Sequence, residues 1–222
     1  MEKGGRLLAA GAPIRTRETR GWAAACAAPG AHGILVPGNR AGQRKGRKYD
    51  VVFWDFDGTL VYSHSLWTRG ALDALRQAGG ELDYEQLRPF TRNIYPWDVP
   101  DPEYRPLQGQ AWWDYVEQQF CAAYCRAGIG EDLACRAAAG LRQQILQVEK
   151  YHLFDDTIPA LQLCRAQGVR NILLSNNYPE LEQIVEQLAL TPWLDGMVVS
   201  GQIGWDKPRP EILAPGMALA GP

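Results

Sequence analysis

The sequence predicts an α/β fold: a parallel β-sheet core with a helical cap inserted after the first strand. Three observations support this. A short apolar run at residues 49–54 ends at polar residues, a block with helical periodicity spans residues 62–150, and strand and helix patterns then alternate. Strands that alternate with helices form right-handed βαβ units around a parallel sheet. We therefore assign residues 49–61 and 151–222 to the core, 62–150 to the cap and 1–48 to a leader.

The leader is predicted to be disordered. It holds ten basic and two acidic residues, a net charge of +8 in a chain whose formal charge is −2, and it has no sustained periodicity. A basic tail can contact nucleic acid or anionic lipid. As a secretory signal it is poor because Gly and Pro interrupt its apolar stretch, and as a transit peptide it lacks Ser. We favour a segment that buries no core, and we expect no nucleic-acid partner and no membrane.

The first strand and the cap helices follow from local patterns. Residues 49–54, YDVVFW, are apolar on both faces, which is typical of a central strand. Helices are predicted at residues 66–78, before Gly79 and Gly80, and at 110–128, where large apolar residues recur every fourth position. A third helix is expected at 131–150, with acidic residues in its first turn. The proline-rich residues 95–106 form a loop.

The remaining core elements alternate. A helix at residues 159–167 is followed by a strand at 169–174. A helix at 179–190 has Pro179 at its start, and a strand follows at 196–200. The tail after residue 207 is rich in Gly, Pro and Ala, which is unlike a helix packed on the core.

Polar residues follow each predicted strand. Asp55 and Asp57 come after the first, Ser175 and Asn176 after the second, and Lys207 shortly after the third. Parallel sheets bind ligands at the carboxyl ends of their strands. This set suits phosphoryl transfer. A carboxylate can attack phosphorus and a second can move protons, while an ammonium and a hard cation such as Mg²⁺ neutralise charge.

The segments "DFDGT", "LLSNN" and "WDKPRPEI" resemble, in order, three motifs of the haloacid dehalogenase-like hydrolase superfamily, in its phosphatase type with an α-helical cap. The resemblance implies a Rossmann-like core, with Asp55 as nucleophile and Mg²⁺ ligand. It implies Asp57 as general acid and base, with its main-chain carbonyl on the metal. An aspartate at this second position points to phosphate rather than halide chemistry. The implied phosphate-binding residues are Thr59, Ser175, Asn176 and Lys207.

The expected function is Mg²⁺-dependent hydrolysis of a small phosphorylated metabolite through a phospho-Asp55 intermediate. A phosphotransferase or mutase, or an inactive form acting by protein association, remain alternatives. The family also carries a fourth motif, an acidic pair after the lysine, whereas Glu211 is the only acid after Lys207. We therefore expect a truncated core that lacks its C-terminal strands, impaired activity, and an unpaired sheet edge at residues 51–54 through which chains self-associate.

Two further predictions concern substrate choice and location. The loop at residues 95–106 supplies Trp97 and Arg105 as candidate substrate-selecting residues, although packing of Trp97 and solvation of Arg105 are about equally expected. The five cysteines are odd in number and form no CxxC pair. This favours reduced thiols and a cytoplasmic protein.

Overall fold

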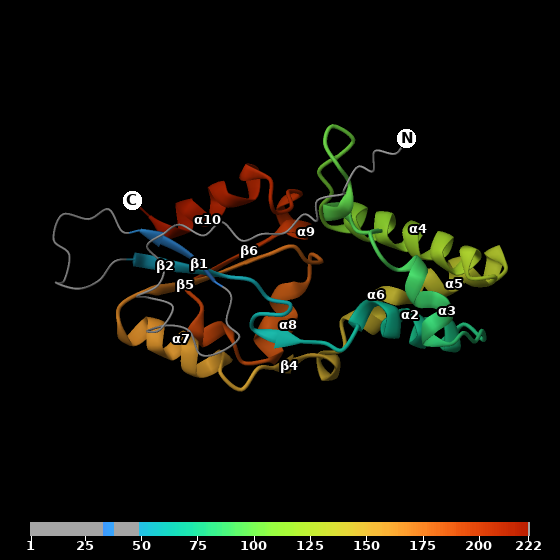
Figure 1. The fold of residues 1–222 in the computed structure, drawn as a ribbon, viewed down its shortest axis with the longest axis horizontal. Coiled ribbons are helices and arrows are strands. Elements are labelled where there is room, and N and C mark those ends of the chain that lie inside the picture. Colours follow the sequence, from blue (N-terminus) through green and yellow to red (C-terminus); the bar gives the residue numbers. More distant parts are fainter. Residues whose placement is uncertain (1–32, 38–48, 222) are drawn as a thin grey trace, which may run out of the picture.

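The computed structural model describes residues 33–37 and 49–221, and it is an α/β fold with a helical segment beside it (Figure 1). A four-stranded sheet runs in the order β1-β2-β5-β6. Strand β2 pairs in parallel with β5, and β5 with β6, while β1 is antiparallel to β2. The strands of this sheet are β1 (Gly33–Pro37), β2 (Tyr49–Trp54), β5 (Arg170–Ser175) and β6 (Gly196–Val199).

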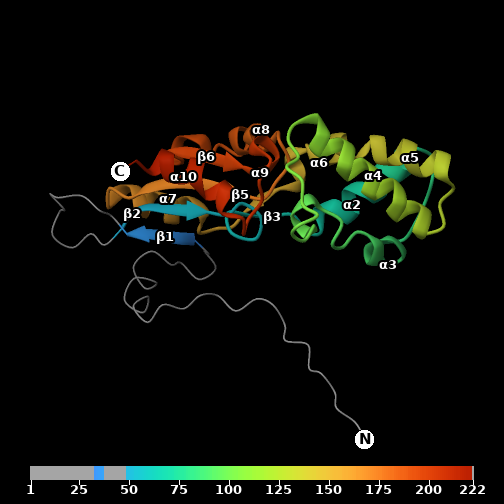
Figure 2. The same ribbon diagram turned by 90° about the horizontal axis from the view of Figure 1, so that it is seen from above.

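Strand β1 corrects two expectations. We expected no regular structure in residues 1–48, yet Gly33–Pro37 form a strand; the other residues of this leader lie outside the described ones. We also expected residues 51–54 to be an unpaired edge, but Leu35 pairs with Val52 and Ile34 with Phe53. The apolar stretch between a glycine and a proline has the composition of a strand, and pairing satisfies the backbone groups of β2. Strand β2 is therefore not a free edge of the sheet in the described residues (Figure 2).

The two faces of the sheet are covered by different helices. Val51 and Phe53 belong to a cluster with residues of the C-terminal helix, while Val52 and Trp54 belong to the larger core that includes the other two helices. This alternation follows from the period of two along a strand. The covering helices are α10 (Leu213–Ala220) on the first face, and α7 (Thr157–Ala166) and α8 (Leu181–Gln187) on the second.

Helix α10 contradicts the expectation that the C-terminal tail does not pack as a core helix. Gly216 lies against the Phe53 ring so closely that a Cβ there would stand 3.0 Å from a ring carbon. The small residues of the tail thus allow the helix to approach the sheet. Short elements precede it in the chain: η5 (Thr191–Trp193), α9 (Ser200–Ile203) and η6 (Pro210–Ile212).

A helical segment lies between β2 and α7, joined to the core by the two-stranded ribbon of β3 (Val61–Tyr62) and β4 (His152–Leu153). Trp112, Trp113 and Phe120 are fully buried in its packing. None of the helices in the described residues is both long and apolar enough to cross a membrane. The elements of this helical segment are α2 (Leu66–Gln77), α3 (Tyr84–Leu87), η2 (Arg88–Phe90), η3 (Pro96–Asp98), α4 (Gln110–Arg126), α5 (Glu131–Ala139), α6 (Leu141–Ile145) and η4 (Val148–Lys150).

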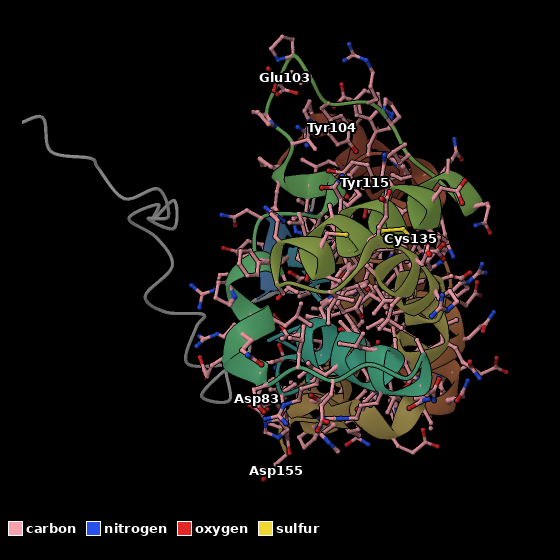
Figure 3. The ribbon with its side chains drawn as sticks, turned by 90° about the vertical axis from the view of Figure 1, so that its right-hand side faces the viewer. Asp83, Glu103, Tyr104, Tyr115, Cys135 and Asp155 are labelled. Carbon is pink, nitrogen blue, oxygen red and sulfur yellow. A yellow bond between two sulfur atoms is a disulfide. The ribbon has the colours of Figure 1, made fainter. Side chains whose placement is uncertain are left out.

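Two local expectations about this segment are wrong. The helix expected at residues 131–150 breaks at Gly140, whose N–H bonds to the Ala137 carbonyl three residues back, because glycine propagates a helix poorly. The cysteines are not all reduced: Cys121 of α4 and Cys135 of α5 form a disulfide with Cα atoms 4.8 Å apart (Figure 3). Sequence spacing did not indicate this pair because the helices meet only after folding.

Candidate active site

The loop after β2 presents two aspartates at the carboxyl edge of the sheet. Gly58 adopts a left-handed φ of 74° and donates its N–H to the Val61 carbonyl at 2.8 Å, while Leu60 and Val61 donate to the Phe56 carbonyl. Glycine takes this conformation without a Cβ penalty. The loop therefore turns back on itself immediately after Asp57.

Asp55 is anchored on both carboxylate oxygens. Oδ1 accepts hydrogen bonds from the Phe56 N–H at 2.8 Å and from the Ser175 hydroxyl at 2.9 Å. Oδ2 lies 2.9 Å from the Lys207 ammonium. The side chain remains 42% exposed, so it is held in place and still open on one side. Such an arrangement holds the carboxylate in place without enclosing it.

Lys207 is positioned by the strand-end loop of β5. Its ammonium also donates to the Leu174 carbonyl at 2.9 Å. The Asn176 side chain holds the Lys207 main chain from both directions, accepting from its N–H at 2.6 Å and donating to its carbonyl at 3.0 Å. The structure thus brings together Asp55, Ser175, Asn176 and Lys207 from three separate parts of the sequence. The Asn176 side chain contacts the main chain of the loop that carries Lys207.

Asp57 stands in a different environment. Its Oδ2 accepts from the Asn177 amide at 2.7 Å. The carboxylate faces a cavity and is open to it, yet the protein atoms around it displace much of its water. This desolvation is the largest cause of a pKa raised to about 6; the Asp55 charge also raises the pKa of Asp57, while the Asn177 hydrogen bond and the Lys207 charge lower it. Asp57 can therefore exchange protons near neutral pH.

Thr59 lies behind the loop. It is buried, and its main-chain N–H donates to the Phe56 carbonyl at 3.3 Å. It does not line the cavity that Asp57 faces. The geometry is that of a residue supporting the loop.

The cavity beside Asp57 has a volume of about 480 Å³ and lies between the core and the helical segment. Of the two candidate substrate-selecting residues, Trp97 lines the cavity and Arg105 does not. The Arg105 guanidinium folds back onto the Pro102 and Tyr104 carbonyls at 2.7 and 2.8 Å. The lining residues are Asp57, Ser63, Ser65, Leu66, Trp67, Thr68, Tyr84, Arg88, Thr91, Arg92, Tyr95, Trp97, Asn176 and Asn177.

The sequence reasoning assigned no role to Asn177, Arg88 or Arg92. Asn177 adjoins Ser175 and Asn176 at a strand end, and that position was the available signal. The two arginines stand in a stretch without a recognisable motif. Only the fold of the helical segment places them beside the cavity.

The site offers oxygen ligands to a divalent cation. The Asp55 carboxylate and the Asp57 main chain are hard donors of the kind that Mg²⁺ prefers. Within the described residues there is no group of three or more His, Cys, Asp or Glu side chains suited to hold a metal. Mg²⁺ commonly binds through one or two carboxylates and completes its shell with waters and substrate phosphate. The donors present fit such a loosely held ion.

A sheet edge that brings paired aspartates together with a serine and a lysine, beneath a helical insert, defines a capped α/β hydrolase. The haloacid dehalogenase-like hydrolase model matches residues 49–219. The chain belongs to this family of hydrolases.

Individual relatives are similar over most of their length. Haloacid dehalogenase-like hydrolase domain-containing protein 3 of Homo sapiens is 29% identical over 180 residues, covering 77% of this chain and 68% of that protein. A solved structure named a phosphatase, from Clostridium difficile, superposes with a TM-score of 0.55 at 16% identity, covering 79% and 72% of the chains. A magnesium-bound HAD-hydrolase of Bacillus subtilis gives 0.54 at 14% identity, covering 74% and 70%. At these identities the structures support the shared fold.

Proposed function

We propose that this protein hydrolyses phosphomonoesters of small metabolites through a phospho-Asp55 intermediate. One observation carries the proposal. Asp55 is held between the Ser175 hydroxyl and the Lys207 ammonium, and a second carboxylate with a pKa of about 6 stands two residues away in the same loop. Nucleophile, charge neutralisation and proton donor are thus supplied together.

The first step transfers the phosphoryl group to the protein. An Asp55 carboxylate oxygen attacks phosphorus, the bond from phosphorus to the ester oxygen breaks, and its electron pair stays on the leaving oxygen. Protonated Asp57 gives that oxygen its proton, releasing the alcohol. Lys207 and the Ser175 hydroxyl stabilise negative charge as it moves.

The second step regenerates the enzyme. Asp57, now a carboxylate, takes a proton from water, whose oxygen attacks the phosphorus of phospho-Asp55. Inorganic phosphate leaves with the electron pair returning to the Asp55 oxygen. A single group with a pKa of about 6 serves both steps because appreciable fractions of each protonation state coexist near neutral pH.

A bound Mg²⁺ would be held by the Asp55 carboxylate and the Asp57 main-chain carbonyl. When bound, it neutralises charge on the phosphoryl oxygens. The magnesium-bound Bacillus subtilis hydrolase with a similar fold supports this choice of ion. We further propose a cytoplasmic location, where the reducing environment would act on the Cys121–Cys135 disulfide that the structure contains.

The test is hydrolysis of p-nitrophenyl phosphate with and without Mg²⁺, with inorganic phosphate measured directly. We expect Mg²⁺-dependent release, reduced by at least about 10³-fold in Asp55→Asn. Release of nitrophenol with phosphate appearing on an added alcohol instead would favour the phosphotransferase alternative. A folded chain with no turnover, or an Asp55→Asn variant with full activity, would overturn the proposal.

A further inference from the structure

The wall that the helical segment contributes to the cavity carries more positive than negative charge. Arg88 and Arg92 both line it, whereas Asp57 is the one acidic side chain among the lining residues of the described chain. The rest of the chain is predominantly acidic. The total charge is −2 and the leader carries +8, so residues 49–222 carry a net charge of −10.

These two arginines are poorly neutralised by the protein. Arg92 forms no hydrogen bond, ion pair or ring contact with any residue that the structure describes. Arg88 reaches Glu85 only at 4.0 Å, in a pair whose side chains are 45% and 79% exposed, and such exposed pairs contribute little. Its guanidinium also lies 5.7 Å from the Tyr84 ring centroid.

Three other arginines of the helical segment are occupied. Arg142 is paired with Glu180, and Arg76 lies 2.9 Å from Asp73. Arg105 is bonded to main-chain carbonyls, although it was the sequence-based candidate for substrate contact. A planar guanidinium offers paired donors that match carboxylate and phosphate oxygens. Arg88 and Arg92 therefore have unused capacity for an anion.

The arginines are separate from the reacting centre. The charges that shift the pKa of Asp57 are those of Asp55 and Lys207, and neither cavity arginine contributes. Aromatic rings form another part of the wall: Tyr95 and Trp97 are stacked with centroids 4.9 Å apart, and Trp67 lies 5.2 Å from Tyr95. The cavity thus combines Asp57, Asn176 and Asn177 of the candidate site with an apolar wall and a cationic region.

We propose that this cavity selects phosphomonoesters that carry a second anionic group, a carboxylate or another phosphate, which Arg88 and Arg92 bind. This inference rests on the proposed phosphatase function and adds the class of substrate to it. The aromatic wall contacts the carbon skeleton between the two anionic groups. Phosphomonoesters whose remaining groups are neutral leave both guanidiniums unmatched and react less efficiently.

The experiment compares substrates of similar size that differ in the remote group. 3-Phosphoglycerate and glycerol 3-phosphate differ by a carboxylate, and fructose 1,6-bisphosphate and fructose 6-phosphate by a phosphate. We expect kcat/KM to be about tenfold or more higher for the anionic member of at least one pair. The pair in which the anionic member has the higher kcat/KM shows whether the cavity prefers a carboxylate or a phosphate as the second anion. No preference in either pair would overturn the proposal.

Variants assign the preference to residues. Arg92→Gln and Arg88→Gln should each lower the ratio of kcat/KM between the anionic and the neutral substrate toward one. Hydrolysis of p-nitrophenyl phosphate, which has no second anion, should fall much less than hydrolysis of the anionic substrate. Arg105→Gln is the matched control because its guanidinium lies outside the cavity lining, and it should retain the full preference. A preference that persists in both cavity variants would contradict the assignment.

The design separates this inference from the proposed function. If no phosphate ester is turned over, including p-nitrophenyl phosphate, the phosphatase proposal fails. Calorimetric binding of the same four compounds then tests the cavity directly. Tighter binding of the dianionic members, lost in Arg92→Gln, would support the cavity proposal, and equal binding would reject it. Circular dichroism and melting curves confirm that each variant is folded.

Discussion

At the scale of single residues, the loop after β2 gives two aspartates opposite surroundings. Asp55 receives two hydrogen bonds and lies beside an ammonium. Desolvation and the neighbouring Asp55 carboxylate raise the pKa of Asp57 to about 6, although the Asn177 amide and Lys207 lower it. Different surroundings for two nearby acids are the usual basis for dividing attack from proton transfer.

The Asn177 amide is a tuning contact that can be tested. It stabilises the charged form of Asp57, so Asn177→Ala should raise the pKa of Asp57 above about 6. The general acid then stays protonated to higher pH, and the alkaline limb of the kcat/KM profile should move up by roughly one pH unit. Gln202→Ala, which removes an exposed amide bonded to the Pro179 carbonyl, should leave the profile in place. An unmoved limb in Asn177→Ala would show that Asp57 does not set it.

The residues that the sequence could and could not predict differ in kind. Asp55 follows β2, Ser175 ends β5 and Lys207 lies shortly after β6. Parallel pairing of these strands was therefore enough to predict that the three residues converge. The roles proposed for them stay predictions. Arg88 and Arg92 reach the cavity through turns between short helices, and nothing in local periodicity determines where such turns point.

At the scale of elements, local sequence patterns correctly predicted the helices and strands whose conformation does not depend on long-range packing. The β2 and β5 runs and the helices near α2, α4, α7 and α8 follow from periodicity and stop residues. Strand β1 was missed because pairing with β2, a long-range contact, determines its conformation. Helix α10 was missed because its composition is weakly helical, although small residues are what its close contact with Phe53 requires.

The disulfide between α4 and α5 gives an element-scale prediction. It closes a separation of 14 residues, so its loss should lower the free energy of unfolding by about 3 kcal/mol, from loop entropy in the unfolded chain. We expect Cys135→Ser to lower the midpoint of guanidinium unfolding, and dithiothreitol to lower the wild-type midpoint to match. Cys125→Ser, at an exposed free thiol of α4, should have little effect. A wild-type midpoint insensitive to dithiothreitol would contradict the prediction.

At the scale of the whole molecule, two sets of contacts hold the helical segment against the core. On one side, the Tyr104 hydroxyl shares its proton between the Gly204 carbonyl at 2.8 Å and Asp206 Oδ2 at 2.7 Å. Arg209 lies 3.2 Å from Asp101. Figure 3 labels Tyr104 and its neighbour Glu103 in the loop that makes these contacts. These contacts join the loop after η3 to the segment that carries Lys207. The cavity walls therefore depend on how the two parts dock.

Glu180 provides the second set of contacts. It stands at the start of α8 in the core, where it accepts from the Trp113 indole N–H at 2.8 Å and pairs with Arg142. Both partners belong to the helical segment. Because Glu180 is only 14% exposed in its side chain while Arg142 is 39% exposed, the indole contact is the better shielded of the two.

Removing Glu180 should loosen the docking of the whole helical segment. Glu180→Ala leaves the buried Trp113 N–H without an acceptor and Arg142 without its carboxylate, a loss of about 1–3 kcal/mol. Because residues of both parts line the cavity, we expect KM for a phosphomonoester to rise, and small-angle scattering to report a larger radius of gyration. Glu182→Ala, at an exposed position two residues along in α8, is the matched control and should change neither. Unchanged KM and dimensions in Glu180→Ala would mean that the contacts on the Tyr104 side hold the two parts together without it.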